Sequence, residues 1–312
     1  MHKLPLGIPA SGKGRLTVPD IVCVSAAMQN VMALAARFAT VDEKVLITGE
    51  SGVGKDLIAR CIHACSQRAD RRFVAINCAG IPDGLIESEL FGHARGSFTG
   101  ARGDQIGKLA LAHRGTVFLD EVAEMSGRMQ AVLLRFLESG EIQPVGVVKD
   151  IRVNARIITA TNRDLSDLLA SGSFREDLLY RIQVGRIHVP PLRERPDDIP
   201  PLVEDLVKRS GRAVRFTSDA MAALVRYGWP GNVRELRNVV ERAVWMSESE
   251  VIDRSGLTFL DAAICAADSR SRERDKVGRR QSRSNRVSDP ACARAETPSA
   301  TSPGDSRPRC VP

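Results

Sequence analysis

The chain has 312 residues, of which 43% are apolar, so it can bury one substantial core and a smaller packed unit. No run approaches the roughly 18 apolar residues of a membrane span, and Lys3, Pro5 and Gly7 break the apolar stretch that a signal peptide needs, so we expect a cytoplasmic protein. The net charge is +7, but residues 266–312 carry 11 Arg and Lys against 6 Asp and Glu, so the rest is nearly neutral and predicts no nucleic-acid-binding fold.

A phosphate-binding loop is predicted at 49–55, where the sequence GESGVGK follows the apolar run 45–48. A strand would lead into a glycine-rich turn whose backbone N–H groups can surround phosphate oxygens, and Lys55 adds a positive charge at the next helix. That helix is predicted over 55–66, because apolar residues recur there at three- and four-residue spacing. The alternative is a glycine turn before an ordinary helix.

A second run with the same glycine and lysine spacing, at 7–13, is not predicted to bind phosphate. No strand leads into it, Pro9 interrupts it, and no helical periodicity follows before Pro19, so nothing would direct amides or a helix dipole at a phosphate. Position 56 is Asp where a Ser or Thr usually ligates magnesium, which weakens the nucleotide prediction for 49–55 taken alone.

Short apolar runs alternate with helical patterns after residue 45, which is typical of a parallel sheet covered by helices. The predicted strands are 45–48, 73–76, 116–119, 153–161 and 186–189. Pro190 and Pro191 end this α/β region, and a small helical domain follows. Its predicted helices are 199–210, 218–227 and 232–247. The predicted domains are a flexible extension at 1–18, an α/β domain at 19–190, a helical domain at 191–254 and a disordered basic tail at 255–312.

The segment 89–101 fits no core pattern, because glycines at 92, 96 and 100 surround Phe98. Glycine permits hinge conformations and a single aromatic can anchor a contact, so we predict an exposed loop that presents Phe98 and Thr99 to a partner. The alternative is that Phe98 folds back to fill a tight turn.

Two carboxylates, Asp120 and Glu121, end the predicted strand 116–119. In an open α/β sheet the C-terminal strand ends line the ligand crevice, so Asp120 could hold Mg²⁺ beside the phosphates and Glu121 could orient a water. The alternative is an acidic cap on the following helix. The loop at 49–55 favours the functional interpretation.

The seven cysteines show no CxxC spacing, and we expect no structural disulfides. Cys61 and Cys65 share a helix face, but no second pair of ligands accompanies them, so a metal site is not predicted there.

At the residues named above the sequence resembles the AAA+ ATPase domain of bacterial enhancer-binding proteins, the activators of sigma-54 RNA polymerase. The resemblance runs from about residue 19 to residue 253, and GSFTGA at 96–101 is similar to that family's GAFTGA loop, with Ser97 in place of the first Ala. The family commonly carries Glu where this chain has Asp56. The resemblance implies a three-layer αβα domain with a parallel sheet, a small α-helical lid, and ATP with Mg²⁺.

Residue roles carry over one position at a time. Asn77 would bond the glutamate at 121 and relay the nucleotide state, although a strand-end cap is the alternative. Arg175 and Arg181 match positions that reach into a neighbouring subunit's site, although surface pairing with Glu176 and Asp177 is the alternative. The implied catalytic residues are Asp120, which would also bind the metal, Glu121, Asn77, Thr161, Asn162, Arg175 and Arg181. The implied nucleotide-binding residues are Gly49, Glu50, Ser51, Gly52, Val53, Gly54, Lys55, Asp56 and the lid residue Arg234. The implied partner-binding residues are Gly96, Ser97, Phe98, Thr99, Gly100 and Ala101.

The resemblance implies an ATPase that assembles as a closed ring, usually a hexamer, and remodels the sigma-54 polymerase bound to promoter DNA. Two departures stand out: Ala94 and Arg95 occupy positions where the family usually has Glu, and no helix-turn-helix follows Asp253, so promoter DNA would be contacted only indirectly. No sensory domain is found before residue 19, and we hypothesise a truncated or frame-altered end. The alternatives are a regulator that binds ATP and modulates a full-length activator, and an unfoldase, which would usually present a different pore loop.

Overall fold

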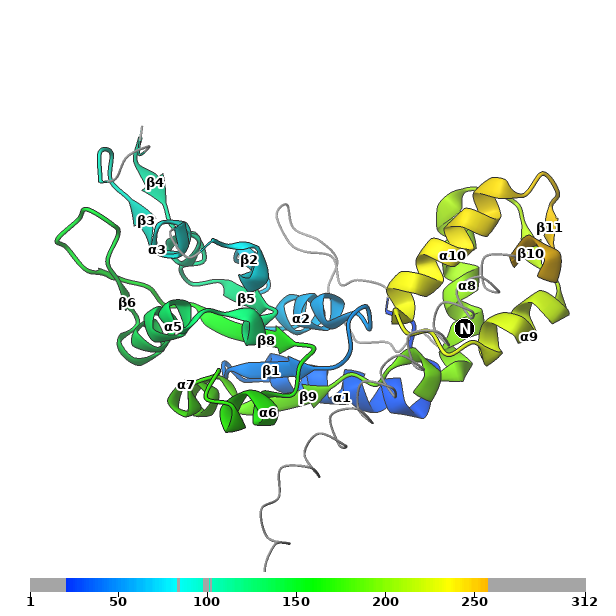
Figure 1. Ribbon diagram of the computed structural model, residues 1–312, viewed down its shortest axis with the longest axis horizontal. Helices are drawn as coiled ribbons and strands as arrows, with labels where there is room; N and C mark the ends of the chain where they lie inside the picture. Colours follow the sequence, from blue (N-terminus) through cyan, green and yellow to red (C-terminus); the bar gives the residue numbers. More distant parts are fainter. Residues whose placement is uncertain (1–20, 83–84, 98–100, 102, 258–312) are drawn as a thin grey trace, which may run out of the picture. The chain divides into compact units, whose positions relative to one another are not determined.

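A computed structural model describes residues 21–82, 85–97, 101 and 103–257 (Figure 1). The expectations for 1–18, for the run at 7–13 and for most of the basic tail lie outside these residues. Phe98, Thr99 and Gly100 lie outside them as well.

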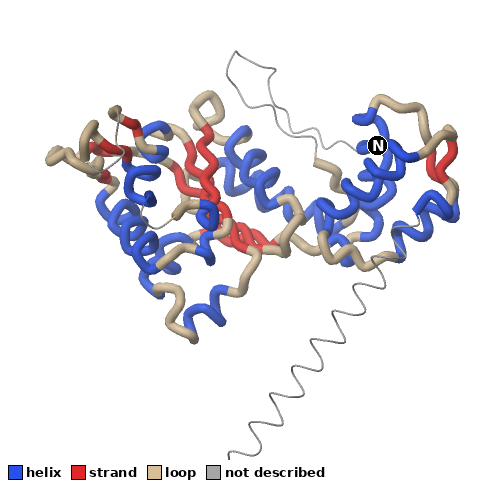
Figure 2. Tube along the Cα trace, turned by 45° about the horizontal axis from the view of Figure 1, so that its top comes forward, coloured by secondary structure: helices blue, strands red, loops and turns tan. Residues whose placement is uncertain are grey.

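A five-stranded parallel sheet forms the centre of the α/β region (red in Figure 2). The strand order is β2-β5-β8-β1-β9. The strand bounds are Val45–Thr48 for β1, Phe73–Asn77 for β2, Thr116–Asp120 for β5, Arg156–Thr161 for β8 and Gly185–His188 for β9. Because all five strands run the same way, their C-terminal ends meet at one edge of the sheet.

Helices cover both faces of this sheet, because alternate strand residues point to opposite sides. Val45 and Ile47 pack into one apolar cluster, and Leu46 packs into the other. The first cluster includes α1 (Ala26–Thr40) and α2 (Lys55–Ala64). The second includes α3 (Ile86–Phe91), α4 (Lys108–Leu111), α5 (Gly127–Ser139), α6 (Leu165–Ala170) and α7 (Glu176–Ile182). The three-layer αβα arrangement is thereby confirmed.

Two short antiparallel hairpins extend from this domain. The first pairs β3 (Gly92–His93) with β4 (Gln105–Ile106) and carries the loop at 96–101. The second pairs β6 (Glu141–Ile142) with β7 (Ile151–Arg152). Backbone hydrogen bonds join them, from Ala94 N to Val145 O at 3.0 Å and from Val145 N to Gly92 O at 2.9 Å.

The predicted strand 153–161 is wrong in its first three residues, since β8 begins at Arg156. The neighbouring strand β5 begins at Thr116, opposite Arg156, so residues 153–155 have no ladder partner there. Their backbone bonds elsewhere: Val153 N donates to Gly140 O at 2.8 Å, and Asn154 O accepts from Arg114 N at 2.6 Å. Val153 is therefore tied to the residue before the second hairpin, and Asn154 to Arg114, rather than to the sheet.

Three helices form the second, smaller core: α8 (Ile199–Ser210), α9 (Ser218–Arg226) and α10 (Asn232–Met246). Beside them, β10 (Arg215–Phe216) pairs in parallel with β11 (Val251–Ile252). Trp229 is fully buried, and its indole N–H donates to Leu224 O at 2.8 Å. No helix in the described ranges combines the length and apolarity needed to cross a membrane.

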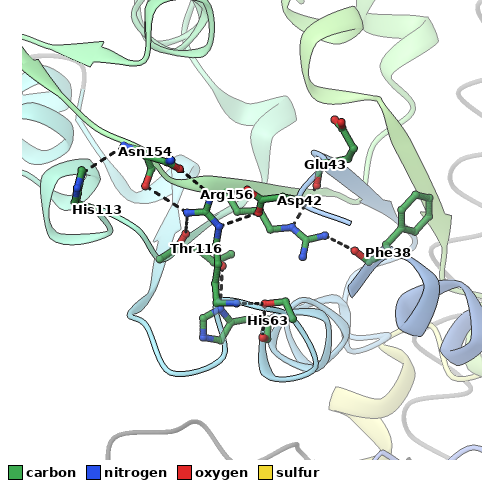
Figure 3. A network of polar contacts seen from close by, with 11 residues as sticks. Phe38, Asp42, Glu43, His63, His113, Thr116, Asn154 and Arg156 are labelled. Atoms are coloured by element: carbon green, nitrogen blue, oxygen red, sulfur yellow. Dashed lines mark hydrogen bonds and ion pairs between the residues drawn. The ribbon is translucent and has the colours of Figure 1, made fainter. Parts of the chain in front are cut away.

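A polar network holds the N-terminal strand ends, at the edge of the sheet opposite the strand C-termini (Figure 3). The buried guanidinium of Arg156 donates to Phe38 O at 2.6 Å and to Glu43 O at 3.3 Å. The fully buried His63 on α2 shares a hydrogen bond of 2.8 Å with the Thr116 hydroxyl on β5. These contacts pair the Arg156 guanidinium, His63 Nδ1 and the Thr116 hydroxyl, and they fix α1 and α2 to the sheet.

Candidate nucleotide site

The predicted phosphate loop connects β1 to α2, as the sequence indicates. Gly49, Gly52 and Gly54 have φ angles of +152°, +80° and +99°, where L side chains are strained. A Cβ on Gly52 would lie 2.3 Å from the carbonyl oxygen of Gly231, so this glycine also permits a close approach of the helical region. Gly54 is the N-cap of α2, which leaves the first amides of the helix directed at the loop.

Lys55 lies inside this loop and is only 8% exposed. Its ammonium donates to the carbonyl oxygens of Gly49 at 2.8 Å and Glu50 at 2.9 Å. Burial lowers the pKa of Lys55, while the carboxylates of Asp120 and Glu121 act in the opposite direction. The buried ammonium and the amides of the loop are suited to bind a polyanion, whereas the nearby carboxylates require a cation between them and a phosphate.

The two carboxylates lie at the C-terminal end of β5. Asp120 is half-buried and accepts a hydrogen bond from Glu121 N at 2.9 Å. Burial raises the pKa of Asp120, whereas that hydrogen bond and the charge of Lys55 lower it. Glu121 has φ +55° and ψ +44°, a left-handed conformation that costs about 1–3 kcal/mol in a non-glycine residue.

A cavity of about 770 Å³ joins these groups. Of the predicted residues, those that line it are Ser51, Gly52, Val53, Gly54, Lys55, Asp56, Asp120, Glu121, Asn162 and Arg234. The described residues include no cluster of three or more His, Cys, Asp or Glu side chains that could hold a metal alone. Mg²⁺ at Asp120 would therefore share its ligands with phosphate oxygens and water, which is its usual preference. The donor set fits a Mg²⁺–triphosphate.

The helical region supplies walls that the sequence did not identify. From α8 these are Leu202, Asp205, Leu206 and Arg209, and further wall residues are Ile21, Val22, Met28, Arg195, Val233 and Arg237. The α8 residues recur at three- and four-residue spacing, a pattern that predicts an amphipathic helix but not a cavity wall. Arg195 is 3% exposed and its Nη2 donates to the carbonyl oxygen of Val53 at 3.0 Å.

Several predicted site residues lie beside this cavity or away from it. Asn77 ends β2 opposite Asp120, and its Oδ1 accepts a hydrogen bond from Ala79 N at 2.9 Å, so in this state it caps the following turn. Thr161 is fully buried, and its hydroxyl bonds the backbone of Arg163. Gly49 and Glu50 belong to the loop but do not line the cavity.

The two predicted trans-acting arginines are about half exposed and lie on the α7 side of the domain. Arg175 pairs with Asp177 at 2.7 Å, and Arg181 lies 3.6 Å from Glu138. Within one chain the Arg175 contact matches the surface-pairing alternative, whereas Arg181 contacts Glu138, which that alternative did not name. A role in a neighbouring subunit's site stays a prediction.

The base of the loop at 96–101 is closed by a hydrogen bond from Gly96 N to Ala101 O at 2.9 Å. The Ser97 hydroxyl is buried without a hydrogen-bond partner, and a Cβ on Gly146 would lie 2.7 Å from the Ser97 Cβ. Ser97 therefore packs against Gly146 of the second hairpin, where a side chain would collide with it.

Comparison with known proteins agrees with this geometry. The family model described as the Sigma-54 interaction domain matches residues 21–188, and that of the AAA+ ATPase lid domain matches residues 193–273. The Nif-specific regulatory protein of Klebsiella pneumoniae is 48% identical over 255 residues, which cover 80% of this chain and 48% of that protein. The response regulator protein FleR of Pseudomonas aeruginosa is 47% identical over 241 residues, covering 76% of this chain and 51% of FleR.

Among solved structures, NtrX from Brucella abortus in complex with ADP is 38% identical, with a TM-score of 0.71, covering 76% of this chain and 55% of NtrX. The NtrX complex with ATP has the same identity and TM-score. The chain spans about half the length of the curated relatives it matches. The chain belongs to the sigma-54 interaction domain family, whose AAA+ fold joins an α/β nucleotide-binding domain to a helical lid.

Proposed function

We propose that this chain hydrolyses ATP and uses the cycle to remodel the sigma-54 RNA polymerase–promoter closed complex. The observation that carries the proposal is the convergence of Lys55, Asp120, Glu121 and Arg234 around one cavity. An ammonium and backbone amides for phosphates, a carboxylate for a cation and a second carboxylate for water are the groups that phosphoryl transfer needs. The domain boundaries at 19–190 and 191–254 belong to this proposal, as does a cytoplasmic location.

Each group has a separate task in the proposed reaction. Lys55 and the amides of the loop would hold the phosphates of ATP, and Asp120 would hold Mg²⁺, which would supply charge to neutralise those phosphates. Glu121 orients the attacking water and accepts its proton. Asn77 relays the nucleotide state from Glu121, while Thr161 and Asn162 sense the γ-phosphate at the end of β8.

In the proposed ring, a hexamer of copies of this chain, a neighbouring subunit completes the site. Charge spreads over the γ-phosphate oxygens in the transition state, and an arginine supplied from outside is worth roughly 10³–10⁵ in rate in related enzymes. Arg175 and Arg181 are exposed, and their present partners are surface carboxylates that a phosphate could replace.

The loop at 96–101 is the proposed contact with sigma-54. Backbone hydrogen bonds tie its base to the hairpin β6–β7, so the two hairpins would move as a unit. Phe98 and Thr99 would form the contact itself. Promoter DNA would be engaged through the polymerase rather than directly.

The substitution Phe98→Ala tests the proposal. ATP turnover should stay at the wild-type rate, and transcription activated from a sigma-54 promoter should be lost in a purified system. The matched control is Ile106→Ala, which removes an exposed apolar side chain (68% exposed) from the same hairpin. Loss of both activities in Phe98→Ala would place Phe98 in the core, and unchanged transcription would remove the loop from the contact.

A further inference from the structure

The first residue of α10, Asn232, has an unusual environment. It is fully buried and has φ +53°, a left-handed value that asparagine adopts more readily than most residues. Burying an amide is costly unless each of its polar atoms is bonded. The hydrogen-bond partners of the Asn232 amide therefore explain why an amide can be buried at this position.

The Asn232 amide joins three segments that are far apart in the sequence. Its Oδ1 accepts a hydrogen bond from Leu192 N at 2.8 Å, in the connection between the sheet and the lid. Its Nδ2 donates to Ser51 O at 3.0 Å and to Glu50 Oε2 at 3.1 Å, both in the phosphate loop. One side chain thus links the lid helix, the connection and the phosphate loop.

Glu50 belongs to this set of contacts and does not line the cavity. Its carboxylate accepts two hydrogen bonds from the Arg193 guanidinium, at 2.6 and 2.9 Å. The bond with Arg193 lowers the pKa of Glu50, and Asn232 adds to this shift. A carboxylate would repel a phosphate, so its position behind the loop agrees with its charge.

Backbone contacts hold the phosphate loop close to the start of α10. Arg234 N donates to Gly52 O at 3.3 Å, and the Gly52 Cα lies so near Gly231 that any Cβ would collide with its carbonyl. The Arg234 guanidinium donates to the Ser51 hydroxyl at 3.0 Å and lines the cavity. Any displacement of the phosphate loop therefore reaches the start of α10 directly.

We infer that Glu50, Asn232 and Arg193 form a clasp that positions Arg234 over the nucleotide and couples the phosphate loop to the lid. All three are positioning residues, because they act through the loop and through Arg234 and not on the phosphates. The inference deepens the proposed ATPase function and rests on it for its kinetic readout. Nucleotide binding supplies a readout that does not need hydrolysis.

The substitution Asn232→Asp tests the clasp at nearly constant shape. It replaces the amide donor by a carboxylate facing Glu50 Oε2 and Ser51 O, which turns two attractions into repulsions. Affinity for a fluorescent ADP analogue should fall by about ten- to a hundredfold. In the wild type we expect ADP to slow hydrogen exchange at the N-terminus of α10. In Asn232→Asp this slowing should be lost. The control is Asn30→Asp, the same chemical change at an exposed position of α1, which should leave both quantities unchanged.

Two further variants keep the test decisive if Asn232→Asp fails to fold. Glu50→Gln and Arg193→Gln remove the charge of an exposed pair, and each should reduce ADP-dependent protection of α10, with an increase in KM for ATP larger than the decrease in kcat. Wild-type affinity and protection in a folded Asn232→Asp protein, or in both other variants, would overturn the clasp. If the wild-type protein binds ADP with the protection pattern but never hydrolyses ATP, the proposed function fails and the clasp stands.

Discussion

Glu121 combines a carboxylate, a place in the cavity wall and a left-handed backbone, and the backbone strain has to be compensated by its surroundings. The hydrogen bond from its own N–H to Asp120 Oδ1 contributes to this by fixing the turn after β5. The consequence is that the two carboxylates point into one space from adjacent positions. Asp120 can then bind a cation while Glu121 orients a water molecule.

Glu121→Gln should bind ATP as the wild type does and hydrolyse it about a hundredfold or more slowly, because the amide cannot accept the proton of the attacking water. Binding is measured with a fluorescent nucleotide and turnover by phosphate release. Glu124→Gln is the control: this nearby glutamate pairs with Arg163 at 3.1 Å and does not line the cavity. Undiminished turnover would remove Glu121 from its role.

At the scale of single elements, α2 and β5 have two connections. The C-terminal end of α2 meets the N-terminal end of β5 at His63 and Thr116 (Figure 3). At the other ends of the two elements, Lys55 at the start of α2 lies near Asp120 at the end of β5. The contact between His63 and Thr116, at the opposite edge of the sheet, thus helps to fix the position of the phosphate loop relative to the two carboxylates. His63 is neutral in this contact, since burial lowers its pKa to about 4.

This pKa predicts a loss of stability in acid. An unfolded histidine has a pKa of about 6.5, so between pH 6.5 and 4 the unfolded chain binds the extra proton and folding weakens as the pH falls. From pH 7 to pH 5 the contribution of His63 should fall by roughly 2 kcal/mol. Urea unfolding at the two pH values measures it. In His63→Gln that part of the pH dependence should vanish, and an equal pH dependence in the two proteins would contradict the assignment.

Most elements could be predicted from local sequence, because their signals are local. The helix 199–210 is α8 as predicted, and strand 45–48 is β1, since helical periodicity and an apolar run before a glycine loop need no distant information. The early start predicted at 153 failed because pairing is decided by where β5 begins. Asn77 caps a turn and Arg175 pairs with Asp177, as their alternatives predicted. Their predicted functional partners depend on a bound nucleotide and on a neighbouring subunit.

The site could be predicted only where a motif marks it. The phosphate loop and the two carboxylates were found because glycine spacing and acids after a strand have a direct chemical meaning. The wall from α8 and the contacts of Asn232 could not be found in this way, because Leu206 reaches the cavity and Asn232 bonds the loop only after the lid has folded. Long-range contacts between small domains leave no periodic pattern in either segment.

At the scale of the whole molecule, one chain supplies a nucleotide cavity and exposed arginines at a distance from it. Under the proposed trans role of these arginines, a single subunit would lack part of its own catalytic site, and a closed ring would supply the missing part at every interface. ATP turnover per chain should rise steeply with protein concentration in such a system. It would stay constant in a self-sufficient monomer.

Mixing two inactive variants tests this arrangement directly. Lys55→Ala removes the phosphate-binding ammonium, and Arg181→Ala removes the arginine offered to the neighbour, so each alone should lose nearly all turnover. In an equal mixture roughly a quarter of the interfaces of a randomly assembled ring would join an intact cavity to an intact arginine, and turnover should return in proportion. Arg128→Ala, which removes an exposed arginine paired with Glu87, is the control and should be active alone. A mixture that stays inactive, although both variants assemble, would mean that Arg181 acts within its own chain, through its contact with Glu138.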